Sequence, residues 1–269
     1  MSSMKNVVLF VFMFSLFLFG RSYPYNSDES FTKSIFFESN GKVEIEGTNG
    51  KISIEGWDKN EVYIEAYKKV RAKSREKAEE LLKQLEVVIE HQNDLIRIHS
   101  VSPRDNNNGN FWNWIFGDDI SYSVSYNVYV PANTNIDAST TNGKLYLSQV
   151  RGSLGLRTTN GGIQGENLSG NVSAHTTNGS LKIEIENVLN EKEMEFTTTN
   201  GSITVFLPTD INCKINAETT NGSIKTDFPL QIEGKHNQKT IRGKINEGGP
   251  LIFIETTNGS IKILETSHL

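Results

Sequence analysis

Carboxylates at repeated spacing are the first candidates for chemistry, because a positioned acid pair could cleave a polysaccharide. The four residues Thr-Thr-Asn-Gly recur through the second half of the chain, and polar residues stand at fixed offsets from each Asn. Three residues before the Asn, two successive copies carry Glu218 and Glu255. Five residues before the Asn and four residues after it, no two neighbouring copies both carry a carboxylate. We therefore expect a solvated face here, not a glycosidase or lyase centre.

The histidines and the single cysteine give no clear sign of a metal site or of catalysis. None of the five histidines has a partner at metal-ligand spacing, so we predict no metal site and no cofactor. No Gly-x-Ser-x-Gly elbow is present, although a Ser-His-Asp triad stays open, since its members need to meet only in space. The single Cys213 excludes an internal disulfide and is expected to be a small buried residue.

An aromatic segment is the best candidate for binding. Residues 102–119 form a predicted loop that contains Trp112 and Trp114, with Phe111 and Phe116 beside them. Aromatic side chains with a polar edge are common where proteins contact partners, and flat rings also stack on sugars. We predict that Trp112 and Trp114 contact an envelope glycan or a surface protein. The alternative is that these rings fold back and plug the open end of the fold.

The element that must position these groups is the repeat itself. Thr-Thr-Asn-Gly occurs six times, at intervals of 18, 18, 22, 21 and 37 residues, and looser Asn-Gly copies stand at Asn40 and Asn49. The expected structural corners are Asn142, Gly143, Asn160, Gly161, Asn178, Gly179, Asn200, Gly201, Asn221, Gly222, Asn258 and Gly259.

Apolar residues alternate on both sides of each corner. Before the Asn they stand at even offsets, as in Met194 and Phe196, and after it at odd offsets, as in Ile203 and Val205. A continuous strand cannot change parity without turning its apolar side outward. Each copy therefore predicts a corner between two short strands, with a residue at positive φ, which Asn and Gly tolerate. The Thr two residues before each Asn is expected to point inward.

The fold expected is all-β: a β-solenoid-like stack of short strands with TTNG corners, in which Thr and Asn form ladders between coils. The alternative is an antiparallel meander in which each Asn-Gly is a hairpin turn. The long interval over 222–257 is expected to carry an excursion or an extra short coil.

Two regions are expected after the leader. Residues 23–130 form an N-terminal β region with one helix at about 74–85 and the loop 102–119, and this region covers the end of the stack. The stripe of Ala78, Leu81, Leu82 and Leu85 predicts that helix. Residues 131–269 form the repeat stack.

Residues 1–22 have the layout of a signal peptide. Lys5 precedes a 13-residue apolar run, 7–19, which is shorter than the roughly 20 residues that span a bilayer. An uncleaved anchor is the alternative. Cleavage removes Lys5 and Arg21, so the net charge changes from −5 to −7. We expect an exported protein without a transmembrane span, in the periplasm, at the cell surface or outside the cell. Its acidic charge argues against nucleic acid.

Several of these features occur together in one family. They are the leader, Ile54-Glu55-Gly56-Trp57-Asp58, the helix near 74–85, Val128-Tyr129-Val130-Pro131 and the TTNG series. Over about 35–265, the chain resembles the bacterial "putative adhesin" family, a domain-of-unknown-function group of exported β-repeat proteins. The resemblance implies a β-solenoid-like fold at the cell envelope and implies no catalytic residue.

The function expected is a non-enzymatic, adhesin-like envelope protein that acts as a binding or structural module. A carbohydrate-active enzyme on a β-solenoid is the alternative from another class, and a structural envelope component with no ligand is the third. Acids converging in a cleft would favour the enzyme, and an exposed aromatic patch would favour the binder.

Overall fold

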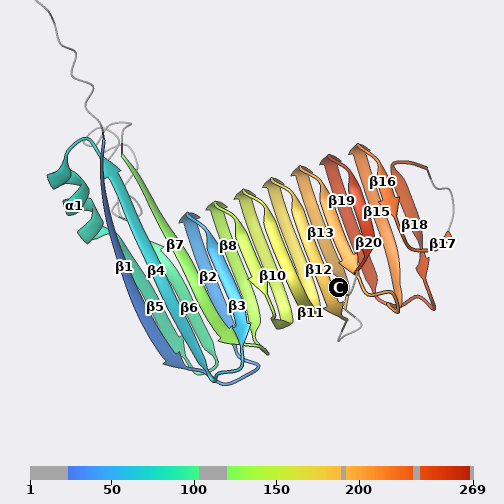
Figure 1. The fold of residues 1–269 in the computed structure, drawn as a ribbon, viewed down its shortest axis with the longest axis horizontal. Helices are drawn as coiled ribbons and strands as arrows, with labels where there is room; N and C mark the ends of the chain where they lie inside the picture. The colour runs from blue at the N-terminus through green and yellow to red at the C-terminus, as the bar shows by residue number, and fades with distance from the viewer. Residues whose placement is uncertain (1–23, 103–119, 189–191, 233–236, 267–269) are drawn as a thin grey trace, which may run out of the picture.

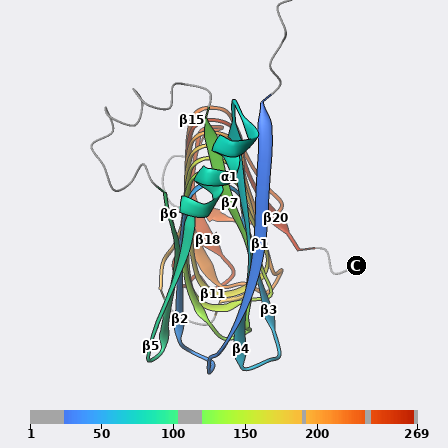
Figure 2. The same cartoon turned by 90° about the vertical axis from the view of Figure 1, so that its left-hand side faces the viewer.

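The computed structural model describes residues 24–102, 120–188, 192–232 and 237–266. The predicted leader and Trp112 and Trp114 lie outside these ranges. Within them, the chain forms an elongated stack of coils made of two facing sheets, with one helix at the N-terminal end (Figure 1). Viewed from that end, the two sheets enclose a flattened core (Figure 2).

One sheet, which we call the upstream sheet, holds the strands that precede each corner. In spatial order it contains β5 (Glu86–Gln92), β6 (Leu95–Val101), β2 (Lys42–Asn49), β8 (Asn135–Asn142), β10 (Arg151–Asn160), the second part of β11 (Ile163–Asn178), β13 (Met194–Asn200), β19 (Leu251–Asn258), β15 (Cys213–Asn221), β18 (Thr240–Ile245) and β17 (Gln231–Ile232).

The other sheet, the downstream sheet, holds the strands that follow the corners. It contains β1 (Tyr25–Phe36), β4 (Glu61–Ala72), β7 (Ser121–Pro131), β3 (Ile52–Trp57), β9 (Leu145–Ser148), the first part of β11, β12 (Leu181–Asn187), β14 (Ile203–Leu207), β20 (Ile261–Glu265) and β16 (Ile224–Thr226).

Coil-to-coil pairing is parallel through the stack, which confirms the solenoid-like fold and makes the meander alternative wrong. β8, β10, β11 and β13 pair in register, so that Asn142, Asn160, Asn178 and Asn200 lie above one another. Antiparallel pairs occur only towards the two ends, as in β1–β4, β4–β7, β5–β6 and β15–β18, among the residues described. Hairpin turns at the corners would have required antiparallel neighbours throughout.

The alternating apolar residues fill the space between the sheets. Met194, Phe196, Ile203 and Val205 have no exposed surface, and the equivalent positions of the other coils are also buried, except Thr226, which is partly exposed. The expectation that apolar offsets are even before the Asn and odd after it is therefore confirmed. Burial of aliphatic side chains from both sheets is the main stabilising contribution to such a fold.

The C-terminal coils do not stack in chain order. β19 lies between β13 and β15, and β20 lies between β14 and β16. The 222–257 interval therefore carries an excursion: after β16, the chain forms β17 and β18, which add to β15 as antiparallel strands, and then turns back into the stack. The coil that ends at Asn258 occupies the position between the coils of Asn200 and Asn221 (Figure 1).

The N-terminal end is covered by α1 (Arg75–Gln84), as the predicted helix near 74–85 requires. Ser74 is its N-cap and accepts a hydrogen bond from the Lys77 amide. Ala78, Leu81 and Leu82 are buried, and the helix packs against β1 and β4 at the end of the two sheets (Figure 2). Coils with apolar interiors need such a cover, because their last layer would otherwise face water.

Candidate functional site

The Asn residues of the corners form a continuous ladder along one edge of the stack. Asn142 Nδ2 donates to Asn49 Oδ1 at 2.8 Å, and the same bond joins every neighbouring pair. The spatial order is Asn49, Asn142, Asn160, Asn178, Asn200, Asn258 and Asn221. Asn40 does not join this ladder, because it lies at φ 72° in the turn before β2.

The corner glycines are explained by close approach, not by positive φ. None of the six TTNG glycines has φ in the left-handed region, so the prediction of positive φ at these corners is wrong. A Cβ on Gly201 would instead lie 1.9 Å from the carbonyl oxygen of Gly179 in the next coil. The left-handed residues occur elsewhere, where the chain turns back from the downstream sheet, at Gln149 and Asn167.

The Thr two residues before each Asn points inward, as predicted. All six of these side chains are buried, and five donate a hydrogen bond to the glycine carbonyl of an adjacent coil. Thr198 Oγ1, for example, lies 2.9 Å from the Gly179 oxygen. The exception is Thr140, whose buried hydroxyl has no partner among the described residues. Thr and Gly therefore act together at each corner.

The closest approach to a catalytic constellation lies on the outer face of the upstream sheet. Ser173 Oγ is 2.8 Å from His175 Nε2, and His175 Nδ1 is 2.7 Å from Thr197 Oγ1. A hydroxyl therefore stands where a triad has a carboxylate, and burial lowers the pKa of His175. β11 is paired on both sides here, with β10 and β13, so its amides are engaged and form no oxyanion hole.

The remaining reactive groups are held in structural settings. Glu218 and Glu255 are aligned on β15 and β19, as their spacing predicts. Within the residues that the structure describes, no cluster of His, Cys, Asp or Glu could hold a metal ion. Cys213 is buried and free, and burial raises the pKa of its thiol to about 12. No helix in the described ranges is long and apolar enough to cross a membrane.

An aromatic patch that sequence analysis did not single out as a site lies on the outer face of the downstream sheet. It consists of Trp57 on β3, Tyr63 on β4 and Tyr129 on β7, all half-buried. Trp57 and Tyr129 stack with ring centroids 5.3 Å apart, and Tyr63 lies 6.3 Å and 6.1 Å from the two. Three adjacent strands thus present one group of rings to the surface.

Polar groups hold and border this patch. The indole N–H of Trp57 donates to the Glu61 carbonyl at 2.9 Å, which fixes the ring. The Lys59 ammonium lies 4.4 Å from the centre of the Trp57 ring, in a cation–π contact. Glu55 stands opposite Tyr129 on the neighbouring strand. The pKa of Tyr129 is raised, mainly by partial burial and to a smaller extent by the nearby carboxylates. The patch therefore combines flat apolar faces with hydrogen-bonding groups at its rim.

Sequence distance explains why this patch was missed. Trp57 and Tyr63 follow each other closely, but Tyr129 is 66 residues beyond Tyr63 and joins them only because β4 and β3 both pair with β7. The available signal was the alternation itself, since Trp57, Tyr63 and Tyr129 occupy outward positions that are otherwise polar. Trp112 and Trp114 lie in the segment that connects β6 to β7, outside the described residues.

The comparison with protein families decides where this chain belongs. The family model Toastrack DUF4097 matches residues 121–264, which is more than half of the chain and runs from β7 to β20. The chain belongs to the Toastrack DUF4097 family. Of the aromatic patch, only Tyr129 lies within the Toastrack match, while Trp57 and Tyr63 precede it. None of the curated proteins matches the chain.

The chain is also similar to several solved structures. A putative cell adhesion protein from Clostridium sporogenes is 16% identical, with 89% of this chain and 100% of that chain covered and a TM-score of 0.44. A putative adhesin from Bacteroides fragilis is 11% identical (88% and 97% covered, TM-score 0.32). A putative lipid binding protein from Parabacteroides distasonis is 12% identical (88% and 97% covered, TM-score 0.30).

Proposed function

We propose that this Toastrack protein is an exported, non-enzymatic, adhesin-like protein of the cell envelope that binds glycan through the aromatic patch. The observation that carries the proposal is the grouping of Trp57, Tyr63 and Tyr129 on one outer face. The stacked rings match the flat apolar faces of sugar rings, and Glu55 at the rim offers hydrogen bonds to sugar hydroxyls.

Two other functions are less well supported. An enzyme would need acids or an activated nucleophile converging in a cleft, whereas Ser173 and His175 lie on the outer face of a strand that is paired on both sides. A purely structural component would need no group of half-exposed aromatic rings. The names of the similar structures, which include adhesins and a lipid binding protein, agree with a binding role, but their low identity limits them to the fold.

The direct test is to truncate Trp57 and to measure binding to a glycan array and to isolated envelope polysaccharide. We expect Trp57→Ala to weaken glycan binding by about tenfold or more, the range for a central aromatic contact. Phe206→Ala is the matched control, because Phe206 is a half-buried aromatic residue on the same sheet, on β14 in a distant coil. Equal binding by both variants, with unchanged thermal midpoints, would refute the aromatic patch as the glycan site.

The segment with Trp112 and Trp114 remains a second proposed contact. If the segment contacts a ligand, Trp112→Ala should reduce binding and leave the thermal midpoint nearly unchanged. If the segment instead plugs the end of the fold, the same change should lower the free energy of unfolding by about 3–5 kcal/mol, the range for a buried aromatic residue. If Trp112→Ala and Trp114→Ala change neither property, the segment has neither role.

Export is tested separately from binding. We expect the mature chain to begin near Tyr23 and to be recovered from the periplasm, the cell surface or the medium. Cell fractionation with mass spectrometry of the N-terminus measures both properties. An intact leader in the membrane fraction would support the uncleaved anchor.

A further inference from the structure

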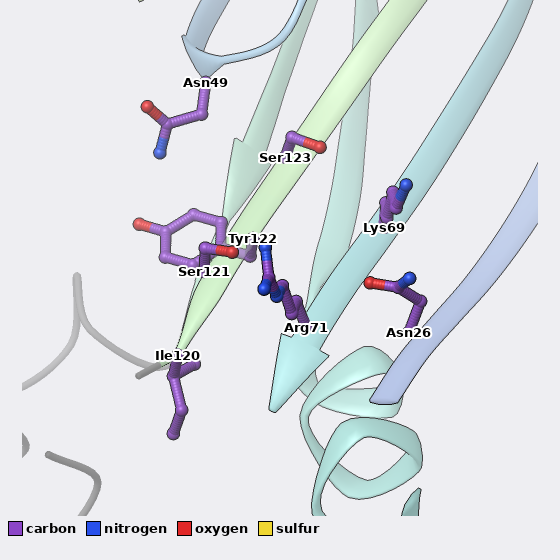
Figure 3. A pocket seen from close by; sticks show the side chains of 8 residues that line it. All are labelled: Asn26, Asn49, Lys69, Arg71, Ile120, Ser121, Tyr122 and Ser123. Atoms are coloured by element: carbon purple, nitrogen blue, oxygen red, sulfur yellow. The ribbon is translucent and has the colours of Figure 1, made fainter. Parts of the chain in front are cut away.

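The downstream sheet carries a second candidate site, beyond the aromatic patch, at the corner of Asn49. A pocket of about 550 Å³ opens there, lined by Asn26, Asn49, Lys69, Arg71, Ile120, Ser121, Tyr122 and Ser123 (Figure 3). Two of the eight residues are cations, and none is acidic. Along β4, Lys69 is six residues from Tyr63, or about 20 Å at the rise of an extended strand, so the pocket is distinct from the aromatic patch.

Strand register brings the polar groups of the pocket together. Lys69 and Arg71 are two residues apart on β4 and therefore project from the same face. Ser123 and Ser121 of β7 stand opposite them, and Asn26 of β1 stands opposite Arg71 on the other side. The two cations are thus flanked by hydroxyl and amide groups, which are the partners that an oxyanion takes.

Neither cation is neutralised within the described ranges. Lys69 and Arg71 form no ion pair there, although other exposed cations do, such as Arg97 with Glu44 at 2.7 Å. Asp28 stands opposite Lys69 on β1, but it does not line the pocket and comes within 4.0 Å of no described cation. Lys69 and Arg71 thus lie side by side without an ion-pair partner among the described residues, in a chain with net charge −5.

The asparagine ladder adds a third donor to the pocket. Each Nδ2 in the ladder donates to the Oδ1 of its neighbour, and the direction of these bonds runs toward Asn49. Asn49 is the last member, so its Oδ1 accepts from Asn142 while its own Nδ2 has no acceptor among the described residues. Aligned hydrogen bonds polarise one another, which strengthens the terminal donor. In Figure 3 the amide nitrogen of Asn49 points to the side of the pocket lined by Tyr122.

We infer that this pocket binds an oxyanion, namely a carboxylate, sulfate or phosphate group, held by Arg71, Lys69 and the amide of Asn49. Guanidinium and ammonium groups form strong, charge-assisted hydrogen bonds with such anions. The anion is either free or carried on a larger molecule such as an acidic sugar, since both present the same group to the pocket.

Isothermal titration calorimetry at low ionic strength tests this inference with sulfate, glucuronate and uncharged glucose as probes. We expect the wild-type protein to bind at least one of the two anions and not glucose. The double variant Lys69→Gln/Arg71→Gln should weaken that binding by about tenfold or more, because it removes two charged donors. Binding of sulfate alone would identify a free-anion site, and binding of glucuronate identifies a site that accepts an anion on a sugar.

Two further variants make the result specific. Lys144→Gln/Lys182→Gln removes the same charge from a separate lysine-lined hollow around Tyr146 and should change the affinity by less than about twofold. Asn49→Asp keeps an acceptor for Asn142 but replaces the terminal donor with a negative charge, so anion binding should fall by about tenfold or more. Trp57→Ala should leave sulfate affinity unchanged, which separates this inference from the glycan proposal.

The inference is overturned by either of two results. One is the absence of binding of both anions to the wild-type protein. The other is equal weakening by the Lys69/Arg71 and the Lys144/Lys182 double variants, which would show a nonspecific response to net charge. The thermal midpoint of each variant, measured without anion, shows whether that variant still folds.

Discussion

The corner edge and the outer faces of the stack follow opposite rules. At the corner edge, the six TTNG coils repeat Thr, Asn and Gly, and each of these residues contacts its counterpart or a neighbour in the next coil. On the outer faces the residues change from coil to coil. The aromatic patch lies there, and so do Lys69 and Arg71 of the pocket at the Asn49 corner, which we call the basic pocket. Repetition in this chain marks positions where coils must touch, and variation marks positions where a ligand surface can form.

The largest expected effect comes from crowding one corner. In Gly201→Ala the new Cβ would lie only 1.9 Å from the carbonyl oxygen of Gly179, so the two coils must separate. We expect a loss of about 3 kcal/mol or more in the free energy of unfolding. Gly155→Ala is the matched control on an outer face, where the Cβ would meet Asp137 Oδ1 at an ordinary 3.5 Å. Urea denaturation of both variants measures the difference, and equal midpoints would contradict the corner rule.

A smaller effect is expected from removing one corner hydroxyl. Thr198→Val keeps the shape of the side chain but deletes the bond to Gly179 O, at a cost of about 1–3 kcal/mol for the unpaired carbonyl. Thr140→Val makes the same change where the buried hydroxyl has no described partner. It should leave stability unchanged or raise it. If both variants lose the same stability, the hydrogen bond is not what the corner threonine contributes.

On an outer face the loss of an ion pair should matter little. Arg157 Nη1 lies 3.0 Å from Asp137 Oδ1, and both side chains are about half exposed. Arg157→Gln should lower the free energy of unfolding by less than about 1 kcal/mol, the usual range for exposed pairs. Denaturation at low and high salt measures this difference, and a loss as large as that of Thr198→Val would break the contrast between edge and face.

The smallest expected effect concerns pH. Burial lowers the pKa of His175 below its usual 6.5, so the unfolded chain binds more protons than the folded chain in the interval between the two values. Stability should therefore fall as the pH drops below about 6.5, and His175→Gln should remove this part of the slope. The change should stay within about 0.5 kcal/mol, the scale of surface substitutions. Thermal midpoints from pH 5 to 8 measure it, and a steeper slope in the variant would contradict the sign.

Much of the architecture could be predicted from local pattern. Parity about each Asn located the two sheets and the inward threonines, because a buried side chain one residue out of place would be exposed. The physical reason for the corner glycine could not be predicted, since a 1.9 Å approach depends on how closely the next coil stacks. The sequence pattern permitted positive φ equally well, and only the stacking of the coils separates the two explanations.

The order of the coils and the surface sites could not be predicted from the local pattern either. Every coil offers the same corner and the same apolar positions, so nothing local shows that the coil of Asn258 lies beside that of Asn200. Likewise, Asn49 becomes the terminal donor of the ladder only through its place in the stack. The aromatic patch and the basic pocket each combine residues from strands that are distant in sequence, which only the topology brings together.

The wedged position of β19 and β20 has a consequence for the time course of folding. Residues 213–245 are synthesised before residues 251–265, yet β15 and β16 reach the rest of the stack only through these later strands. Until the later strands arrive, β13 and β14 leave an open edge, a gap that the coil of β19 and β20 will fill. Such long-range closure is slow. During this delay the gap can accept the same coil from a neighbouring molecule, so concentrated refolding should yield exchanged dimers joined at this position.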